Sequence, residues 1–240
     1  MRLIRNYAAA PIILGMLIGY PPVRGDNDNN GSQDEKQMIQ TGLTEAANIG
    51  ITLKITNQDP DLVGLGSYLV NVTSACNSCH TPVFLYTTFK QPTGNPYFLL
   101  PPFTGKKQAD PNFYLNGGFD FGVPPQIPSF PASTAHIISR NLTPDKNGLP
   151  EGHTLAEFML IMKTGVDLDH FHPNCGLPGV SASDCVATPV NGAVLQVMPW
   201  PFFQSLTDRQ LTAIYTYLST IPCLEGDPGN PSPPTGSRCK

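Results

Sequence analysis

The sequence predicts a mainly α protein in which a few helices are joined by long irregular loops. Three segments have the apolar spacing of a helix, and two of them also begin with residues that favour a helix start. Long stretches between the segments contain too many prolines for helix interiors. Of the 240 residues, 26 are proline and only 13% are charged, a composition typical of extended connections rather than long solvated helices. No convincing set of paired strands is present.

The first expected helix runs from about Asp61 to Ala75 and leads directly into a cysteine motif. Gly66 and Tyr68 lie beside its apolar side. That side consists of Leu62, Leu65, Leu69 and Val70, which recur at three- and four-residue spacing.

Two further helices carry start signals. Thr154 and Glu157 have the spacing of a capping box, and Gly165 ends the helix that follows them. Thr207 and Gln210 repeat that spacing at the start of the last helix. The expected buried stripe of this helix is Leu211, Ile214, Tyr215 and Leu218.

The N-terminal region divides into two parts. Residues 1–25 predict a signal peptide or an N-terminal anchor, because Arg2 and Arg5 precede an apolar run too short to cross a membrane comfortably. Residues 26–58 are expected to be a flexible spacer, since the run 26–36 is polar and lacks an apolar period. A short helix within 37–58 is left open.

Residues 76–80 read Cys-Asn-Ser-Cys-His, a spacing used by zinc half-sites, dithiol switches and covalent haem attachment. A structural zinc site needs four ligands, and no second cysteine pair here has the required spacing. A thioredoxin-like switch needs a βαβ setting, which is not visible. His80 directly after Cys79 completes the c-type haem signature, in which Cys76 and Cys79 form thioethers and His80 binds iron.

A second axial ligand is expected for an electron carrier, and methionine raises the reduction potential. Met159 and Met162 have the helical spacing of core residues. Met198 lies instead in "VMPWPFF", where the prolines favour an extended strap. We expect Trp200, Phe202 and Phe203 to screen it from water. His170 or His172 is the alternative ligand, and His136 and His153 are expected at the surface or in turns.

Three segments resemble bacterial class I (monohaem) cytochromes c, and in particular the haem subunits of periplasmic and membrane-bound dehydrogenases. They are "DLVGLGSYLVNVTSACNSCHTP", "ISRNLTPDKNGLPEGHTLAEFMLIMKTG" and "VMPWPFFQSLTDRQLTAIYTYLSTIP". The resemblance covers about residues 60–223 and is weak over 81–135. It implies a class I cytochrome c fold, in a domain of residues 59–223, around one covalently bound haem c.

The resemblance also implies roles for particular residues. Gly66 and Tyr68 would pack against Tyr215 or Tyr217 where two helices cross. The implied iron ligands are His80 and Met198. The full set of implied cofactor-binding residues is Cys76, Cys79, His80, Met198, Asn141, Thr143 and Trp200. Asn141 and Thr143 would lie near the haem edge, although capping of a turn is an equal alternative for Asn141.

The four other cysteines permit three pairings. In an oxidising compartment we expect the local ones, Cys175–Cys185 and Cys223–Cys239, of which the second would tie down a tail of residues 224–240. Each bridge would stabilise the fold by about 2–4 kcal/mol. Cys175 as a thiolate ligand or nucleophile is the alternative reading.

The function predicted from the sequence is single-electron transfer in the bacterial periplasm. Expected partners are redox proteins, either a dehydrogenase or a membrane respiratory complex, with membrane association through the N-terminus if the leader is retained. A net charge of −4 argues against nucleic-acid binding. We expect no catalytic residue. The alternatives are a haem enzyme with a displaceable ligand, for example in sulfur-compound oxidation, a haem subunit of a dehydrogenase complex, and a zinc module.

Overall fold

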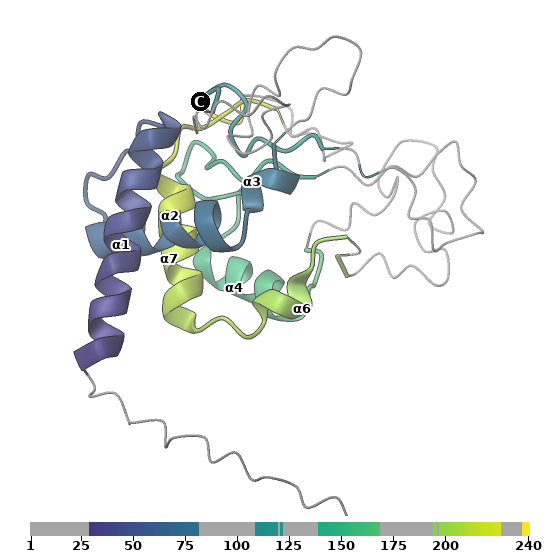
Figure 1. The fold of residues 1–240 in the computed structure, drawn as a ribbon. Coiled ribbons are helices and arrows are strands. Elements are labelled where there is room, and N and C mark those ends of the chain that lie inside the picture. Colours follow the sequence, from purple (N-terminus) through teal and green to yellow (C-terminus); the bar gives the residue numbers. More distant parts are fainter. Residues whose placement is uncertain are drawn as a thin grey trace, which may run out of the picture.

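A computed structural model describes residues 29–81, 109–119, 121, 139–168, 194–195, 197–226 and 237–240. Within these ranges the protein is mainly helical and contains no strand, only two isolated bridges, which confirms the expected class (Figure 1). No helix among the described residues is long and apolar enough to span a membrane. The elements are α1 (Asn29–Ile49), α2 (Pro60–Tyr68), the π-helix η1 (Leu69–Thr73), α3 (Cys76–Cys79), α4 (Leu155–Thr164), α6 (Trp200–Phe203) and α7 (Asp208–Thr220).

The first predicted helix forms in two parts, α2 and η1. Asp59 caps α2 by accepting a hydrogen bond from the Asp61 N–H at 2.9 Å, and Pro60 occupies the first turn, where its missing N–H costs nothing. The π-helical turn of η1 then continues the helix to Thr73. Ala75 adopts a left-handed conformation with φ of 47°, which ends this helix and turns the chain into α3.

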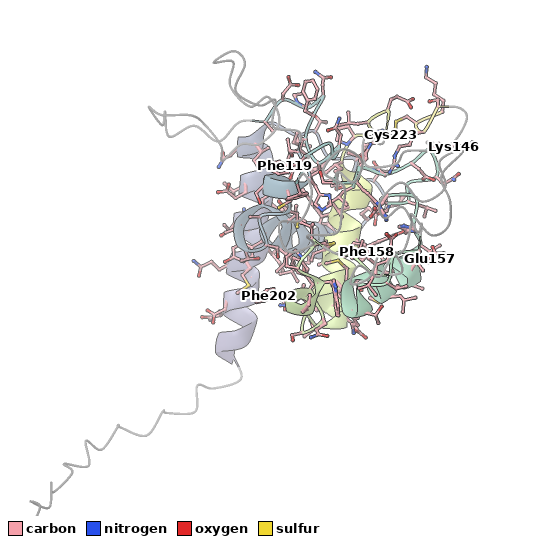
Figure 2. The ribbon with its side chains drawn as sticks, turned by 90° about the vertical axis from the view of Figure 1, so that its right-hand side faces the viewer. Phe119, Lys146, Glu157, Phe158, Phe202 and Cys223 are labelled. Atoms are coloured by element: carbon pink, nitrogen blue, oxygen red, sulfur yellow. A yellow bond between two sulfur atoms is a disulfide. The ribbon has the colours of Figure 1, made fainter. Side chains whose placement is uncertain are left out.

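The capping signals of α4 and α7 are confirmed. The Thr154 and Thr207 side chains each accept from a backbone N–H three residues later, and the Glu157 and Gln210 side chains return the bond to the cap. Gly165 ends α4 in the left-handed conformation at φ of 70°. Three residues of the predicted stripe of α7 are buried. Tyr215 is half-buried, and its ring packs at a tilt of 59° against Phe158 of α4, which Figure 2 labels.

Helix α1 corrects the expected spacer, because residues 29–49 form a continuous helix rather than a flexible segment. It packs across α2, as Figure 1 shows, and buries Ile39, Ala46 and Ile49 in the core. Its Glu35 pairs with Arg209 of α7 at 2.7 Å. Helix α1, the first described element, is therefore a structural layer of the domain.

Glycines allow α2 to approach a helix on each of two sides. A Cβ on Gly66 would lie 1.9 Å from the Ala213 carbonyl oxygen and 2.7 Å from the Tyr217 Cβ, so the expected crossing with the last helix involves Tyr217. A Cβ on Gly42 of α1 would lie 1.9 Å from the Gly64 carbonyl oxygen. Helix α2 is thus packed between α1 and α7, with backbones in direct contact on both sides.

Candidate functional site

One cavity is lined by the four residues that the sequence analysis expected to attach a haem or to bind its iron. Cys76, Cys79, His80 and Met198 all line a mostly apolar pocket of about 1130 Å³ of empty space, open solvent included. Its walls come from α3, from α4 and α7, and from the segments around residues 140 and 198.

The cysteines stand on the single turn of α3, in which the His80 N–H donates to the Cys76 carbonyl at 2.9 Å. Both are free thiols rather than a disulfide. Burial raises the pKa of Cys76 to about 12, so this thiol is neutral and is not poised as a redox-switch thiolate. The two thiols lie at one edge of a mostly apolar pocket, where they suit addition to an apolar partner.

His80 is oriented by the backbone of residue 140. Its Nδ1 lies 2.9 Å from the Arg140 carbonyl oxygen, which can only accept, so Nδ1 carries the proton and Nε2 holds the lone pair. Burial, the larger effect, lowers the pKa of His80, and the neutral ring is the metal-binding form. A histidine whose second nitrogen donates to a carbonyl is the usual arrangement of a metal-ligating imidazole.

The Arg140 side chain adds a charged element that the sequence analysis missed. Its guanidinium binds both carboxylate oxygens of the fully buried Asp167, at 2.7 and 2.8 Å, and lies 3.8 Å from Glu151. Arg140 and Glu151 both line the pocket. The two carboxylates neutralise the guanidinium, so this wall of the pocket carries a charged cluster that is already paired within the protein.

Met198 lines the pocket, but its surroundings differ from those predicted. Residues 200–203 form a helical turn, α6, rather than a fully extended strap. Trp200 does not line the pocket and packs instead on Gly165, where a Cβ would meet its ring at 2.3 Å. Phe202 is 81% exposed (Figure 2) and therefore does not screen Met198, whereas Phe203 lines the pocket beside it.

Met162 of α4 also lines the pocket and is only 3% exposed, so a second thioether faces the same space. The sequence analysis assigned it to the core, and it does pack in the hydrophobic cluster. Met159 is not a lining residue. The two wall-forming methionines are distinguished by position: Met162 is fixed within a helix, whereas Met198 lies in a segment outside regular helix.

Asn141 and Thr143 lie away from the pocket. Both are fully buried, and the Asn141 carboxamide oxygen accepts from the N–H and the hydroxyl of Thr143, at 2.8 and 2.7 Å. The Asn141 amide donates to the carbonyls of Leu224 and Gly226 in the C-terminal tail. Neither residue lines the pocket, so the turn-capping alternative describes Asn141 better than contact with the haem edge.

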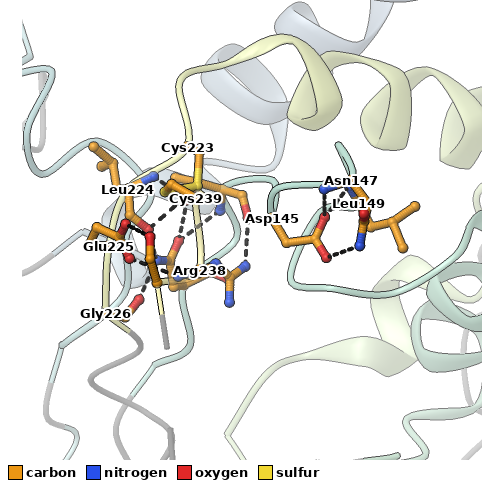
Figure 3. Close-up of a disulfide and its surroundings, with 12 residues drawn as sticks. Asp145, Asn147, Leu149, Cys223, Leu224, Glu225, Gly226, Arg238 and Cys239 are labelled. Carbon is orange, nitrogen blue, oxygen red and sulfur yellow. Dashed lines mark hydrogen bonds between the residues drawn. A yellow bond between two sulfur atoms is a disulfide. The ribbon is translucent and has the colours of Figure 1, made fainter. Parts of the chain in front are cut away.

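The predicted Cys223–Cys239 disulfide is confirmed, with a Cα separation of 5.7 Å (Figure 3). Cys175, Cys185, His136, His170 and His172 lie outside the described residues. His153 ends a turn, as one of the two expectations had it, because its N–H donates to the Pro150 carbonyl at 2.9 Å. It is buried rather than at the surface, and its carbonyl accepts from the Tyr215 hydroxyl at 3.0 Å. Among the residues that the structure describes, no three histidine, cysteine or acidic side chains cluster as a metal site would require.

A network of buried, hydrogen-bonded polar side chains includes a residue of the cysteine-bearing turn α3. No local sequence signal predicts this network. Asn71 of η1 bonds to the hydroxyls of Tyr114 and Tyr217, and its carboxamide oxygen accepts from Asn77 at 3.4 Å. Asn77 stands between the two cysteines. Burial raises the pKa of both tyrosines, so their hydroxyls are neutral partners in this network.

We compared the chain with known protein families, with curated proteins and with solved structures. None of the three comparisons found a match.

Proposed function

We propose that this chain is a monohaem c-type cytochrome that transfers single electrons. One observation carries the proposal: both cysteines of the attachment motif, His80 with its Nδ1 bound to a carbonyl, and Met198 line one apolar pocket. The resemblance of three segments to class I cytochromes c adds independent support. A zinc module does not need such a pocket.

The residues present fit a haem. Cys76 and Cys79 would hold it by thioethers, with His80 and Met198 as the residues available to the iron. A bound haem would supply a one-electron ferric–ferrous couple. The chain contributes the rest: the Arg140 carbonyl orients His80, and the mostly apolar wall excludes water.

We further propose a periplasmic location and a redox partner, either a dehydrogenase or a membrane respiratory complex. The Cys223–Cys239 disulfide supports an oxidising compartment, because such bridges rarely persist in a reducing cytosol. The residues proposed as a leader, 1–25, lie outside the described residues.

Solvent extraction of haem from the purified protein tests the proposal. Acidified organic solvent should leave haem on the wild type and remove it from the variant carrying Cys76→Ala and Cys79→Ala. The matched control carries Cys223→Ala and Cys239→Ala, which also removes two thiols but should retain its haem. Loss of haem from the wild type in this solvent would overturn covalent attachment.

A further inference from the structure

The C-terminal tail returns to the segment that orients His80. After α7 the chain reaches Cys223, and the disulfide to Cys239 brings the last residues back beside it (Figure 3). The described parts of this tail are residues 224–226 and 237–240. They contact residues 141–146, which follow Arg140 directly.

Those contacts are numerous and specific. The Arg238 guanidinium donates to the Thr143 carbonyl at 2.7 Å and to the Asn141 carbonyl at 3.3 Å. The Leu224 N–H donates to the Thr143 hydroxyl at 3.0 Å. The Lys146 N–H donates to the Arg238 carbonyl at 2.8 Å, so Arg238 both donates to this segment and accepts from it.

Arg238 is itself held in place by the tail. Its N–H donates to a Glu225 carboxylate oxygen at 2.8 Å, and the Ser237 hydroxyl bonds to the other oxygen of the same carboxylate. The disulfide through the next residue, Cys239, fixes the chain at that point. The tail therefore presents a pre-positioned cation to two backbone carbonyls.

The segment so held carries the carbonyl that orients His80. The Arg140 carbonyl belongs to the peptide unit that joins Arg140 to Asn141, and Asn141 is bound to the tail through both its side chain and its carbonyl. Gly117 also lies against this same peptide, since a Cβ there would be 2.4 Å from the Arg140 carbonyl carbon. The position of the carbonyl is thus constrained both by the tail and by the segment at Gly117.

We infer that the disulfide-closed tail, through Arg238, is a positioning element that holds the Arg140 carbonyl against His80 and sets the donor strength of that imidazole. A hydrogen bond from Nδ1 to a carbonyl raises the basicity of a metal-ligating histidine. A stronger donor stabilises ferric iron, so the tail lowers the reduction potential. The inference rests on the proposed function, because the quantity set is a property of the bound haem.

The test compares Arg238→Met with the wild-type holoprotein in a spectroelectrochemical titration. At a fixed solution potential, we expect the ratio of ferrous to ferric protein to rise about threefold to tenfold, where tenfold equals about 59 mV for one electron. Arg238→Lys retains a donor for the carbonyls and should recover part of the shift. Arg209→Met, which removes the exposed ion pair to Glu35, is the matched control and should leave the ratio unchanged.

A second variant, Cys239→Ser, opens the tail without altering Arg238 and should shift the potential in the same direction. The shift should be accompanied by altered proton resonances of the axial histidine, which loss of stability alone would not produce. Unchanged potentials in Arg238→Met and Cys239→Ser overturn this inference and leave the proposed function intact. A wild type without haem overturns the proposed function itself.

Discussion

Substitution of Gly66 by alanine tests the helix crossing on which the pocket is built. The new Cβ would lie 1.9 Å from the Ala213 carbonyl oxygen, and ordinary contact requires about 3.4 Å, so α2 and α7 would have to separate locally by about 1.5 Å. The obstructing atoms belong to the backbone, so no rotamer change relieves the overlap.

The expected loss of stability follows from two opposing effects. Overpacking costs about 1–3 kcal/mol, and a rigid backbone obstacle places Gly66→Ala at the upper end. Alanine is favoured over glycine within a helix by about 1 kcal/mol. The net destabilisation should be about 2 kcal/mol, which lowers the thermal midpoint by roughly 4–8 °C for a protein of this length.

Thermal and urea unfolding followed by far-ultraviolet circular dichroism measure this loss. The control is Asn48→Ala, an exposed substitution on α1 that should change stability by no more than about 0.5 kcal/mol. A Gly66→Ala protein that is more stable than the wild type by about 1 kcal/mol would refute the close crossing, since the helix-propensity gain would then act unopposed.

Three further predictions concern the tail and the pocket. Removal of the disulfide by Cys223→Ser with Cys239→Ser should cost about 3 kcal/mol, measured by urea unfolding; an unchanged midpoint would show that the bridge does not constrain the tail. Asn141→Ala leaves the buried carbonyl and N–H partners of Asn141 without their hydrogen bonds. It should lower the free energy of unfolding by about 2–4 kcal/mol in the same assay, and a change below about 0.5 kcal/mol would contradict the buried hydrogen bonding of Asn141. Met198→Ala should abolish the far-red charge-transfer band of the ferric protein, while Met198→His should keep a low-spin haem of lower potential; survival of the band in Met198→Ala would assign the ligand to Met162.

Local sequence signals predicted the helices that begin with a capping box. The Thr154 and Thr207 caps act through residues three positions away, so the sequence alone contains the whole interaction. Helix α1 could not be predicted in this way, because its contacts with α2 depend on packing at Gly42 and Ala46 rather than on a strong apolar stripe. A spacing of buried residues at 39, 42, 46 and 49 was the available signal.

The candidate site likewise has one part that the local sequence predicts and one part that it does not. The attachment motif lies within five residues, so its geometry follows from one helical turn. The carbonyl that orients His80 comes from Arg140, sixty positions away, and the partner of the Arg140 guanidinium is Asp167. Nothing in the local sequence links these residues. The position of Asn141 against the tail likewise depends on the Cys223–Cys239 bridge and the chain path that it closes.

Mass spectrometry of the proteolytic peptide that contains Cys76, Cys79 and His80 tests the central claim most directly. The purified protein, expressed as the full 240-residue chain in a host that matures c-type cytochromes, should yield this peptide with the added mass of one haem. The peptide should also show the visible absorption of a haem joined through two thioethers. An unmodified peptide with two free thiols, from a protein that lacks porphyrin absorption, would contradict the account.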